Sequence, residues 1–131
     1  MNNSINDYID ICIGSNGSHY DVSKVVYELI KDNFKYLGKN TWKYNNNGIY
    51  ENDDKNNNYL KNEIKSHIIN AFIIRSTYWD DKAIIENDIN LSMDYKLKSF
   101  ILLQIAGKLK ETKYIICIIK ELKQFFPDNI E

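Results

Sequence analysis

The chain has 131 residues, enough for one domain whose core shields roughly two thirds of the unfolded surface from water. Its 17 basic and 18 acidic side chains nearly cancel, which excludes a strong overall attraction to nucleic acid or to an anionic membrane. The two cysteines lack the spacing of a metal or redox motif and indicate reduced thiols in an intracellular protein. No segment reaches the ~20 apolar residues of a membrane span, and the first residues lack a basic start. We therefore expect a single domain over residues 1–131, without a leader and without a membrane partner.

The N-terminal quarter of the chain is expected to hold a lead segment and one helix. Residues 1–17 are expected to form a flexible lead. Residues 18–34 carry apolar side chains at helical spacing, in one stripe that extends to Phe34. Ser18 and Asp21, three residues apart, have the form of a capping box and predict where this helix begins.

Residues 34–54 alternate aromatic and polar side chains and predict a small β-hairpin. The pair Asn47-Gly48 is the strongest short signal for a two-residue turn in which both residues have positive φ. In the register that this turn sets, Asn46 lies opposite Ile49. A lone hairpin is only marginally stable in water, so we expect this one to pack on the helices.

The two faces of this hairpin carry different chemistry, because side chains alternate along a strand. Trp42, Tyr44 and Ile49 fall on one face, which we interpret as a structural aromatic face that packs on the helices. Lys43 and Tyr50 fall on the other face. There they could contact a phosphate and a base of a nucleic acid, as the wing of a winged-helix domain does.

Three further helical patterns follow the hairpin. They cover residues 59–75, 95–110 and 112–126. Thr112 is the expected N-cap of the last one, and Pro127 is its expected stop. Residues 76–94 are polar and irregular, and we expect a connection with at most one helical turn. The sequence therefore predicts an α+β fold, mainly α, with about four helices and one small β-hairpin, and a winged-helix-like arrangement is one form that it could take.

No catalytic constellation stands out in the sequence. A phosphate-binding loop and a serine nucleophile elbow are both missing, so we expect no cofactor. The densest carboxylates, from Asp80 to Asp94, would suit a Mg²⁺ site only if they converged, and their dispersal favours a solvated loop with no metal. His67 lies beside an apolar stripe and is interpreted as a core or boundary residue. The lysines from Lys108 to Lys123 are interrupted by glutamates and indicate a solvated helix face.

One long segment carries a resemblance to a known family. The stretch HYDVSKVVYELIKDNFKYLGKNTWKYNNNGIYE begins with a His-x-Asp-Val-Ser-Lys helix start and continues into a Phe-containing strand and an aromatic hairpin. It resembles the region just ahead of the helicase module in poxvirus-type primase-helicases of large DNA viruses, phages and plasmids. The matching positions are His19, Asp21, Val22, Ser23, Lys24, Val25, Val26, Tyr27, Phe34, Trp42, Tyr44 and Glu51. The final segment LKETKYIICIIKELKQFFPDNIE resembles the closing helix of that region, whereas Ile49 departs from the tryptophan that the family usually has in the second hairpin strand.

The resemblance implies a non-catalytic connector, or collar, between a primase and a superfamily 3 helicase, which would support the helicase ring. The implied partners are helicase and primase modules of the same or a partner chain, DNA, and further copies through the helicase context. The implied location is the host cytoplasm, at a viral replication site. Two alternatives stay open. One is a stand-alone nucleic-acid or protein-binding module derived from that domain, and the other is a small metal-dependent nuclease that uses Asp80, Asp81 and Glu86.

We expect the purified chain neither to hydrolyse ATP nor to synthesise primers. The reason is that the sequence lacks the GxxxxGK[ST] loop that holds a nucleoside triphosphate. Phosphate release and primer extension would be measured beside a mock purification from cells without the gene. Turnover clearly above that background would contradict the prediction.

Overall fold

The structure, a computed structural model, describes residues 3–127 and shows a mainly helical α+β fold, which confirms the predicted fold class. Its helices are α1 (Asn3–Gly14), α2 (His19–Ile30), α3 (Asn58–Glu63), α4 (Ile69–Ile85), α5 (Ile89–Lys108) and α6 (Thr112–Leu122). A π-helical turn, Ile64–Ile68, joins α3 to α4 without a break, and a 3₁₀ turn, Lys123–Phe125, follows α6. Its strands β1 (Phe34–Tyr36), β2 (Trp42–Asn46) and β3 (Ile49–Asn52) form one antiparallel sheet in chain order. None of the described helices is both long and apolar enough to cross a membrane.

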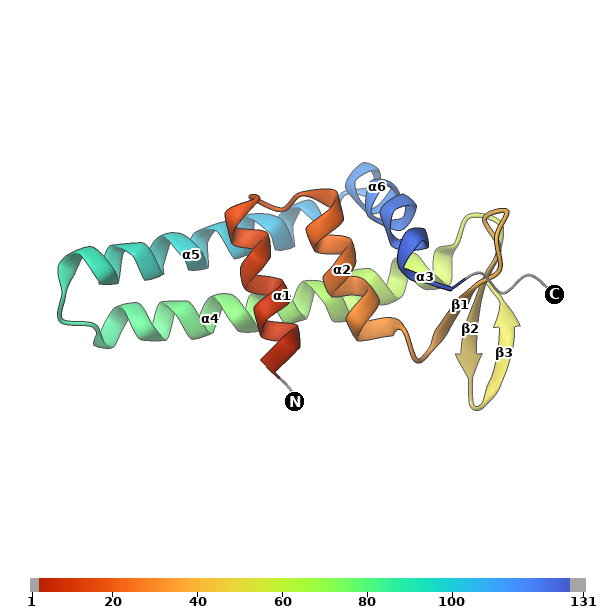
Figure 1. Cartoon of the computed structure of the whole chain (residues 1–131), viewed down its shortest axis with the longest axis horizontal. Coiled ribbons are helices and arrows are strands. Elements are labelled where there is room, and N and C mark those ends of the chain that lie inside the picture. Colours follow the sequence, from red (N-terminus) through yellow and green to blue (C-terminus); the bar gives the residue numbers. More distant parts are fainter. Residues whose placement is uncertain (1–2, 128–131) are drawn as a thin grey trace.

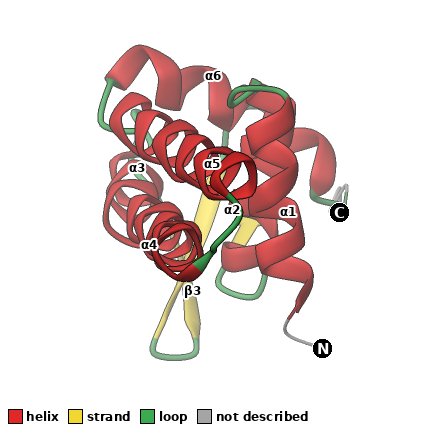
Figure 2. Ribbon diagram, turned by 90° about the vertical axis from the view of Figure 1, so that its left-hand side faces the viewer, coloured by secondary structure: helices red, strands yellow, loops and turns green. Residues whose placement is uncertain are grey.

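The molecule is elongated, with different elements at its two ends (Figure 1). Helices α4 and α5 lie side by side and extend to the left of Figure 1 as a two-helix arm. Viewed along this arm, α1 and α2 cover one side of the α4–α5 pair (Figure 2). The sheet, α3 and α6 gather at the other end of the molecule. The core lies where these two parts meet, and it contains buried side chains from every helix and from β1 and β2.

Helix α2 begins where the sequence predicts. The Ser18 hydroxyl accepts a hydrogen bond from the backbone N–H of Asp21 at 3.2 Å, which caps the first turn. The helix ends at Ile30, however, and not at Phe34 as predicted. Phe34 is the first residue of β1, and its side chain is buried. The apolar stripe therefore continues to Phe34, although the backbone there is that of a strand.

The flexible lead predicted for residues 1–17 is wrong, because most of it forms α1. On one side of this helix Ile9 and Cys12 are buried in the core. On the same helix the Asp10 carboxylate accepts hydrogen bonds from the Arg75 guanidinium at 2.6 and 3.0 Å and from the Trp79 indole N–H at 3.0 Å. These partners lie more than sixty residues further along the chain, so no local pattern could indicate them.

The irregular connection predicted for residues 76–94 is also wrong. Helix α4 continues to Ile85, and α5 begins only a few residues later, capped by the Asp88 carboxylate. Several buried positions of this pair are small or polar, among them Ser76, Ala83 and Ser99. An apolar periodicity is therefore missing from a segment that is helical because its two halves pack on each other.

The register of the hairpin is confirmed, and a third strand joins it. Asn46 pairs with Ile49 as predicted, and both turn residues have positive φ, 55° at Asn47 and 91° at Gly48. Strand β1 pairs with β2 on the side away from β3. With only three residues it is too short for its own periodicity to be visible.

The aromatic face is confirmed for Trp42 and is wrong for Ile49. Trp42 is 1% exposed, and its ring meets the edge of Phe126 with 5.1 Å between the ring centroids. Tyr44 is half-buried, and its ring stacks on that of Tyr59 at 3.7 Å. Ile49 points to the same side but is 67% exposed, since the hairpin tip extends past the helices (Figure 1).

We expect Trp42→Ala to lower the free energy of unfolding by about 3 to 5 kcal/mol, because it removes the largest buried side chain beneath the sheet. The matched control Ile49→Ala, on the same face of the hairpin, should change it by less than about 0.5 kcal/mol. Urea melts of both variants and of the parent chain would measure the difference. Equal midpoints for Trp42→Ala and the parent, together with a loss of DNA binding, would instead make Trp42 a platform for stacking bases.

Candidate nucleic-acid interface

The outer face of the sheet holds the two residues predicted to contact nucleic acid. Lys43 on β2 lies opposite Lys35 on β1. On β3 the Tyr50 hydroxyl donates a hydrogen bond to the backbone carbonyl of Asp32 at 3.0 Å, while the Lys35 ammonium lies 4.3 Å from its ring centroid. The structure therefore brings Lys43 and Tyr50 to one face, as predicted. It also gives Tyr50 a structural task, because the side chain ties β3 to the segment after α2 and has one ring face covered by a lysine.

The charges of this nearly neutral chain are segregated. Residues 31–65 and 108–123 together contain twelve lysines and seven acidic residues, whereas the rest of the chain contains five basic and eleven acidic residues. The two ranges supply the sheet, α3 and α6, which lie at the same end of the molecule (Figure 1). A net charge of −1 therefore conceals one basic end.

Four lysines from separate segments surround one cavity of about 250 Å³ at this basic end, which we call the lysine hollow. Lys55 comes from the loop before α3, Lys61 from α3 itself, Lys120 from α6, and Lys123 from the 3₁₀ turn. Its remaining lining residues are Asn40, Asn56, Asn57, Ile116 and Ile119. The hollow thus combines four flexible ammonium groups with amides and a small apolar floor.

Capping interactions hold the loop that carries Lys55. The Asp53 carboxylate accepts hydrogen bonds from the backbone N–H groups of Tyr59 and Leu60, at 3.0 and 2.9 Å, which anchors the start of α3. The Asp54 carboxylate accepts bonds from the backbone N–H groups of Asn58 and Asn56. These bonds, with that of Asn58 the largest cause, hold the pKa of Asp54 below its ordinary value. Both carboxylates are therefore engaged by the loop backbone.

The lysines of the hollow are not neutralised by ion pairs within the described part of the chain. None of the salt bridges among residues 5–127 includes Lys55, Lys61, Lys120 or Lys123. Lys123 instead donates a hydrogen bond to the side-chain carbonyl of Asn40. An anion that entered the hollow would relieve the mutual repulsion of four like charges. Lysine ammonium groups suit phosphate oxygens as point charges and do not distinguish one base from another.

The acidic residues considered for a metal site do not converge. Asp80 and Asp81 are neighbours on α4, and Glu86 follows the end of that helix. Among the residues that the structure describes, no three histidine, cysteine, aspartate or glutamate side chains form a group that could hold a metal ion. The geometry therefore gives no support to the alternative of a metal-dependent nuclease.

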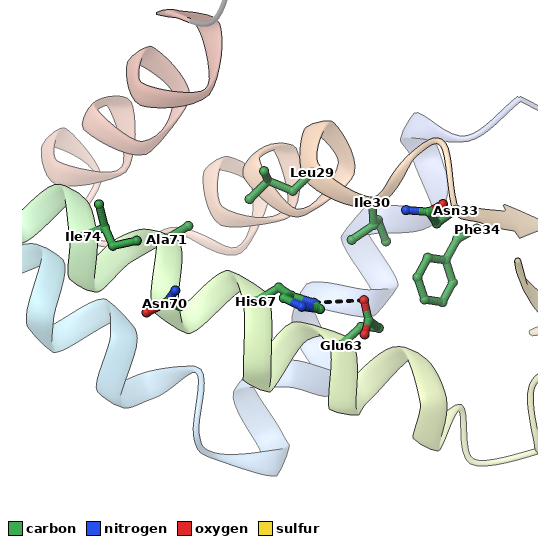
Figure 3. A pocket seen from close by; sticks show the side chains of 9 residues that line it. All are labelled: Leu29, Ile30, Asn33, Phe34, Glu63, His67, Asn70, Ala71 and Ile74. Atoms are coloured by element: carbon green, nitrogen blue, oxygen red, sulfur yellow. Dashed lines mark hydrogen bonds and ion pairs between the residues drawn. The ribbon is translucent and has the colours of Figure 1, made fainter. Parts of the chain in front are cut away.

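A second cavity, of about 350 Å³, lies between the end of α2 and the π-helical turn (Figure 3). Its apolar lining includes Phe34 and Ile74, and on its rim His67 Nδ1 lies 3.0 Å from a Glu63 carboxylate oxygen. His67 is exposed, so the core or boundary position predicted for it is wrong. The residues lining this groove include no serine, threonine, cysteine or lysine that the His67–Glu63 pair could activate, and we assign it no chemistry.

The lysine hollow is a site that sequence reasoning misses. Lys120 and Lys123 are expected on a solvated helix face, and Lys55 and Lys61 carry no signal of their own because they flank an asparagine run, residues 56–58. The only sequence signal is the uneven distribution of charge, which becomes informative once the two lysine-rich ranges are known to meet.

Comparison with known proteins adds no family. No protein-family model matches the chain, and no curated protein matches it.

Proposed function

We propose that this chain is a non-catalytic connector domain of a DNA-replication primase-helicase and that it contacts DNA through the phosphate backbone. The observation that carries the DNA contact is the convergence of four lysines on one hollow at the basic end. The connector role comes from the resemblance of residues 19–51 and 109–131 to the region ahead of a superfamily 3 helicase. Its partners would be the helicase and primase modules, and its location would be intracellular, in the host cytoplasm if the protein is viral.

The residues that carry the resemblance have structural tasks in this fold. The backbone N–H of Asp21 donates the hydrogen bond to Ser18 that caps α2. Val22, Val26 and Trp42 are buried. These residues stabilise the fold beneath the sheet and the basic end. Under the proposal, catalysis would belong to another module. This division of labour is what a connector requires, since it has to position DNA and neighbours without reacting with either.

The proposed contact with DNA is independent of base sequence. The hollow offers ammonium groups, and the aromatic ring that β3 presents on the outer sheet face, Tyr50, is partly covered by Lys35. Phosphate contacts of this kind position a nucleic acid without specifying its sequence. With few phosphates neutralised, the affinity should fall in the non-specific range of about 10⁻⁴ to 10⁻⁶ M and should weaken with salt.

A stand-alone binding module remains the second candidate, and the exposed apolar side chains of the arm favour it. The two candidates differ in whether a helicase module binds the domain. Co-expression of the chain with a superfamily 3 helicase module from the same genome, followed by purification at moderate salt, would distinguish them. A stable complex supports the connector, and separate elution supports the stand-alone module.

We expect Lys61→Ala and Lys120→Ala to weaken DNA binding several-fold each and more when combined. Removal of each phosphate contact should also reduce the slope of log K against log salt by about 0.9 for duplex DNA. Fluorescence anisotropy with two duplexes of unrelated sequence, at several salt concentrations, would measure both quantities. The matched control Lys82→Ala removes a lysine of α4 that lies outside the hollow and should leave the affinity and the salt slope unchanged.

The same titrations test the outer face of the sheet. Lys43→Ala and Tyr50→Ala are expected to have smaller effects on binding than the Lys61→Ala and Lys120→Ala pair. A larger loss from Lys43→Ala would place the DNA on the sheet, as the sequence predicts. Tight binding that persists at high salt would contradict a phosphate contact at the hollow and one on the sheet alike, because it would require a surface that reads bases.

A further inference from the structure

The α4–α5 arm buries small side chains beside the contact of the Trp79 and Tyr95 rings, whose centroids are 5.5 Å apart. Ser76 and Ala83 of α4 and Ser99 of α5 are buried between the helices, each 3% exposed. The Ser92 hydroxyl donates a hydrogen bond to the backbone carbonyl of Ala83 at 2.7 Å, which fastens the outer end of the pair. Small inner residues let the two helices approach closely, but they withdraw little apolar surface from water.

Several large apolar side chains of the arm are nevertheless exposed. Five of them follow one side of α5, the side turned away from the buried positions that face α4. They are Ile89, Met93, Leu97, Phe100 and Leu103, which are 74%, 64%, 55%, 56% and 47% exposed, and we call them the α5 stripe. They recur every three or four residues over about four turns, which is the spacing of a helix face that packs on another helix. In Figure 2, α1 and α2 lie to one side of the arm. The exposed fractions of the five side chains show that these helices do not cover the stripe.

We infer that the α5 stripe packs against the α5 stripe of a second copy of this chain, with the two helices antiparallel. An aromatic side chain presents about 150 to 250 Å², and the four aliphatic side chains of the stripe are near the lower end of that range, so the five at these exposures leave on the order of 500 Å² in water. A standard stable interface needs about 800 Å² per partner, which the polar residues beside the stripe would complete.

The charge around the stripe suits a second copy better than a charged partner. Asp94 and Lys98, beside the stripe, already form an ion pair at 3.4 Å. Lys96 is the one charged residue within the stripe's spacing. In an antiparallel pair Lys96 of one copy faces Phe100 of the other and not a second Lys96, so the two stripes meet without a like-charge contact. An acidic or basic helix would find no matching row of charges.

The spacing fits an antiparallel pair. Ile89, Met93, Lys96, Phe100 and Leu103 are separated by alternating steps of four and three residues, as in a coiled-coil seam. In an antiparallel register Met93 packs against Leu103 of the second copy. Lys96 then lays its stem and ammonium group along the ring of Phe100 of the second copy. Because the pair has two-fold symmetry, each of these contacts occurs twice in the interface.

The inference does not rest on the proposed function, and the full chain tests it directly. Sedimentation velocity over a range of concentrations should show twice the 15.5 kDa monomer mass at the upper end. Met93→Glu and Leu103→Lys should each raise the dimer dissociation constant about 30-fold or more. Ile49→Glu, at an equally exposed isoleucine of the hairpin, should not change it. A parent chain that stays monomeric, or a dimer that tolerates both stripe variants, would overturn the inference.

Mixing the two variants provides a stricter test. In a mixed pair the glutamate introduced at position 93 of one copy would meet the lysine introduced at position 103 of the other. The second contact would remain Met93 on Leu103. The mixture of Met93→Glu with Leu103→Lys should therefore recover dimers that neither variant forms alone. Failure to recover them, with circular dichroism showing both variants folded, would overturn the antiparallel pairing.

Discussion

Burial of Trp42 is the constraint on which the basic end depends. Its ring packs on Phe126, which follows α6, and its backbone carbonyl accepts a hydrogen bond from the N–H of Asp53 at 2.9 Å. Asp53 in turn caps the first turn of α3 with its carboxylate. One residue thus connects the two parts of the chain that carry the lysines, α3 through the Asp53 cap and α6 through the aromatic contact. The hollow exists because both are held against the same strand.

The features that the sequence predicts well are those with local causes. The turn at Asn47-Gly48 fixes the hairpin register, and Ser18 fixes the start of α2, because each signal acts over three or four residues. Helix α1 also has a local signal, since Ile5, Ile9 and Cys12 recur at helical spacing, but its contact from Asp10 to Arg75 forms only in the folded chain. The α4–α5 pair is predicted in part, through the helical patterns over residues 59–75 and 95–110. Only its outer part, residues 76–94, is predicted wrongly, because the buried Ser76 and Ala83 interrupt the apolar periodicity there.

The candidate site is predictable only in part, and the cause is again physical. The outer sheet face follows from strand alternation, which is why Lys43 and Tyr50 are correctly predicted to share one side. The hollow draws lysines from segments about sixty residues apart, and no spacing rule connects Lys61 with Lys120. Net charge is a poor guide because it sums over ends that the fold separates. A net charge near zero excludes a strong electrostatic field of one sign around the whole molecule, but it is compatible with a positive field at one end.

The two proposed surfaces respond to different forces, and this has a consequence for the whole molecule. Attraction at the lysine hollow is electrostatic and is screened within about 10 Å at 0.1 M salt. Packing of the α5 stripe is apolar and does not weaken as salt is added. The hollow lies at the basic end, and the stripe lies on α5 of the arm (Figure 1). A paired molecule would carry two lysine hollows on one scaffold. Binding of one DNA strand to both would then be favoured by effective concentration, although each hollow alone binds weakly.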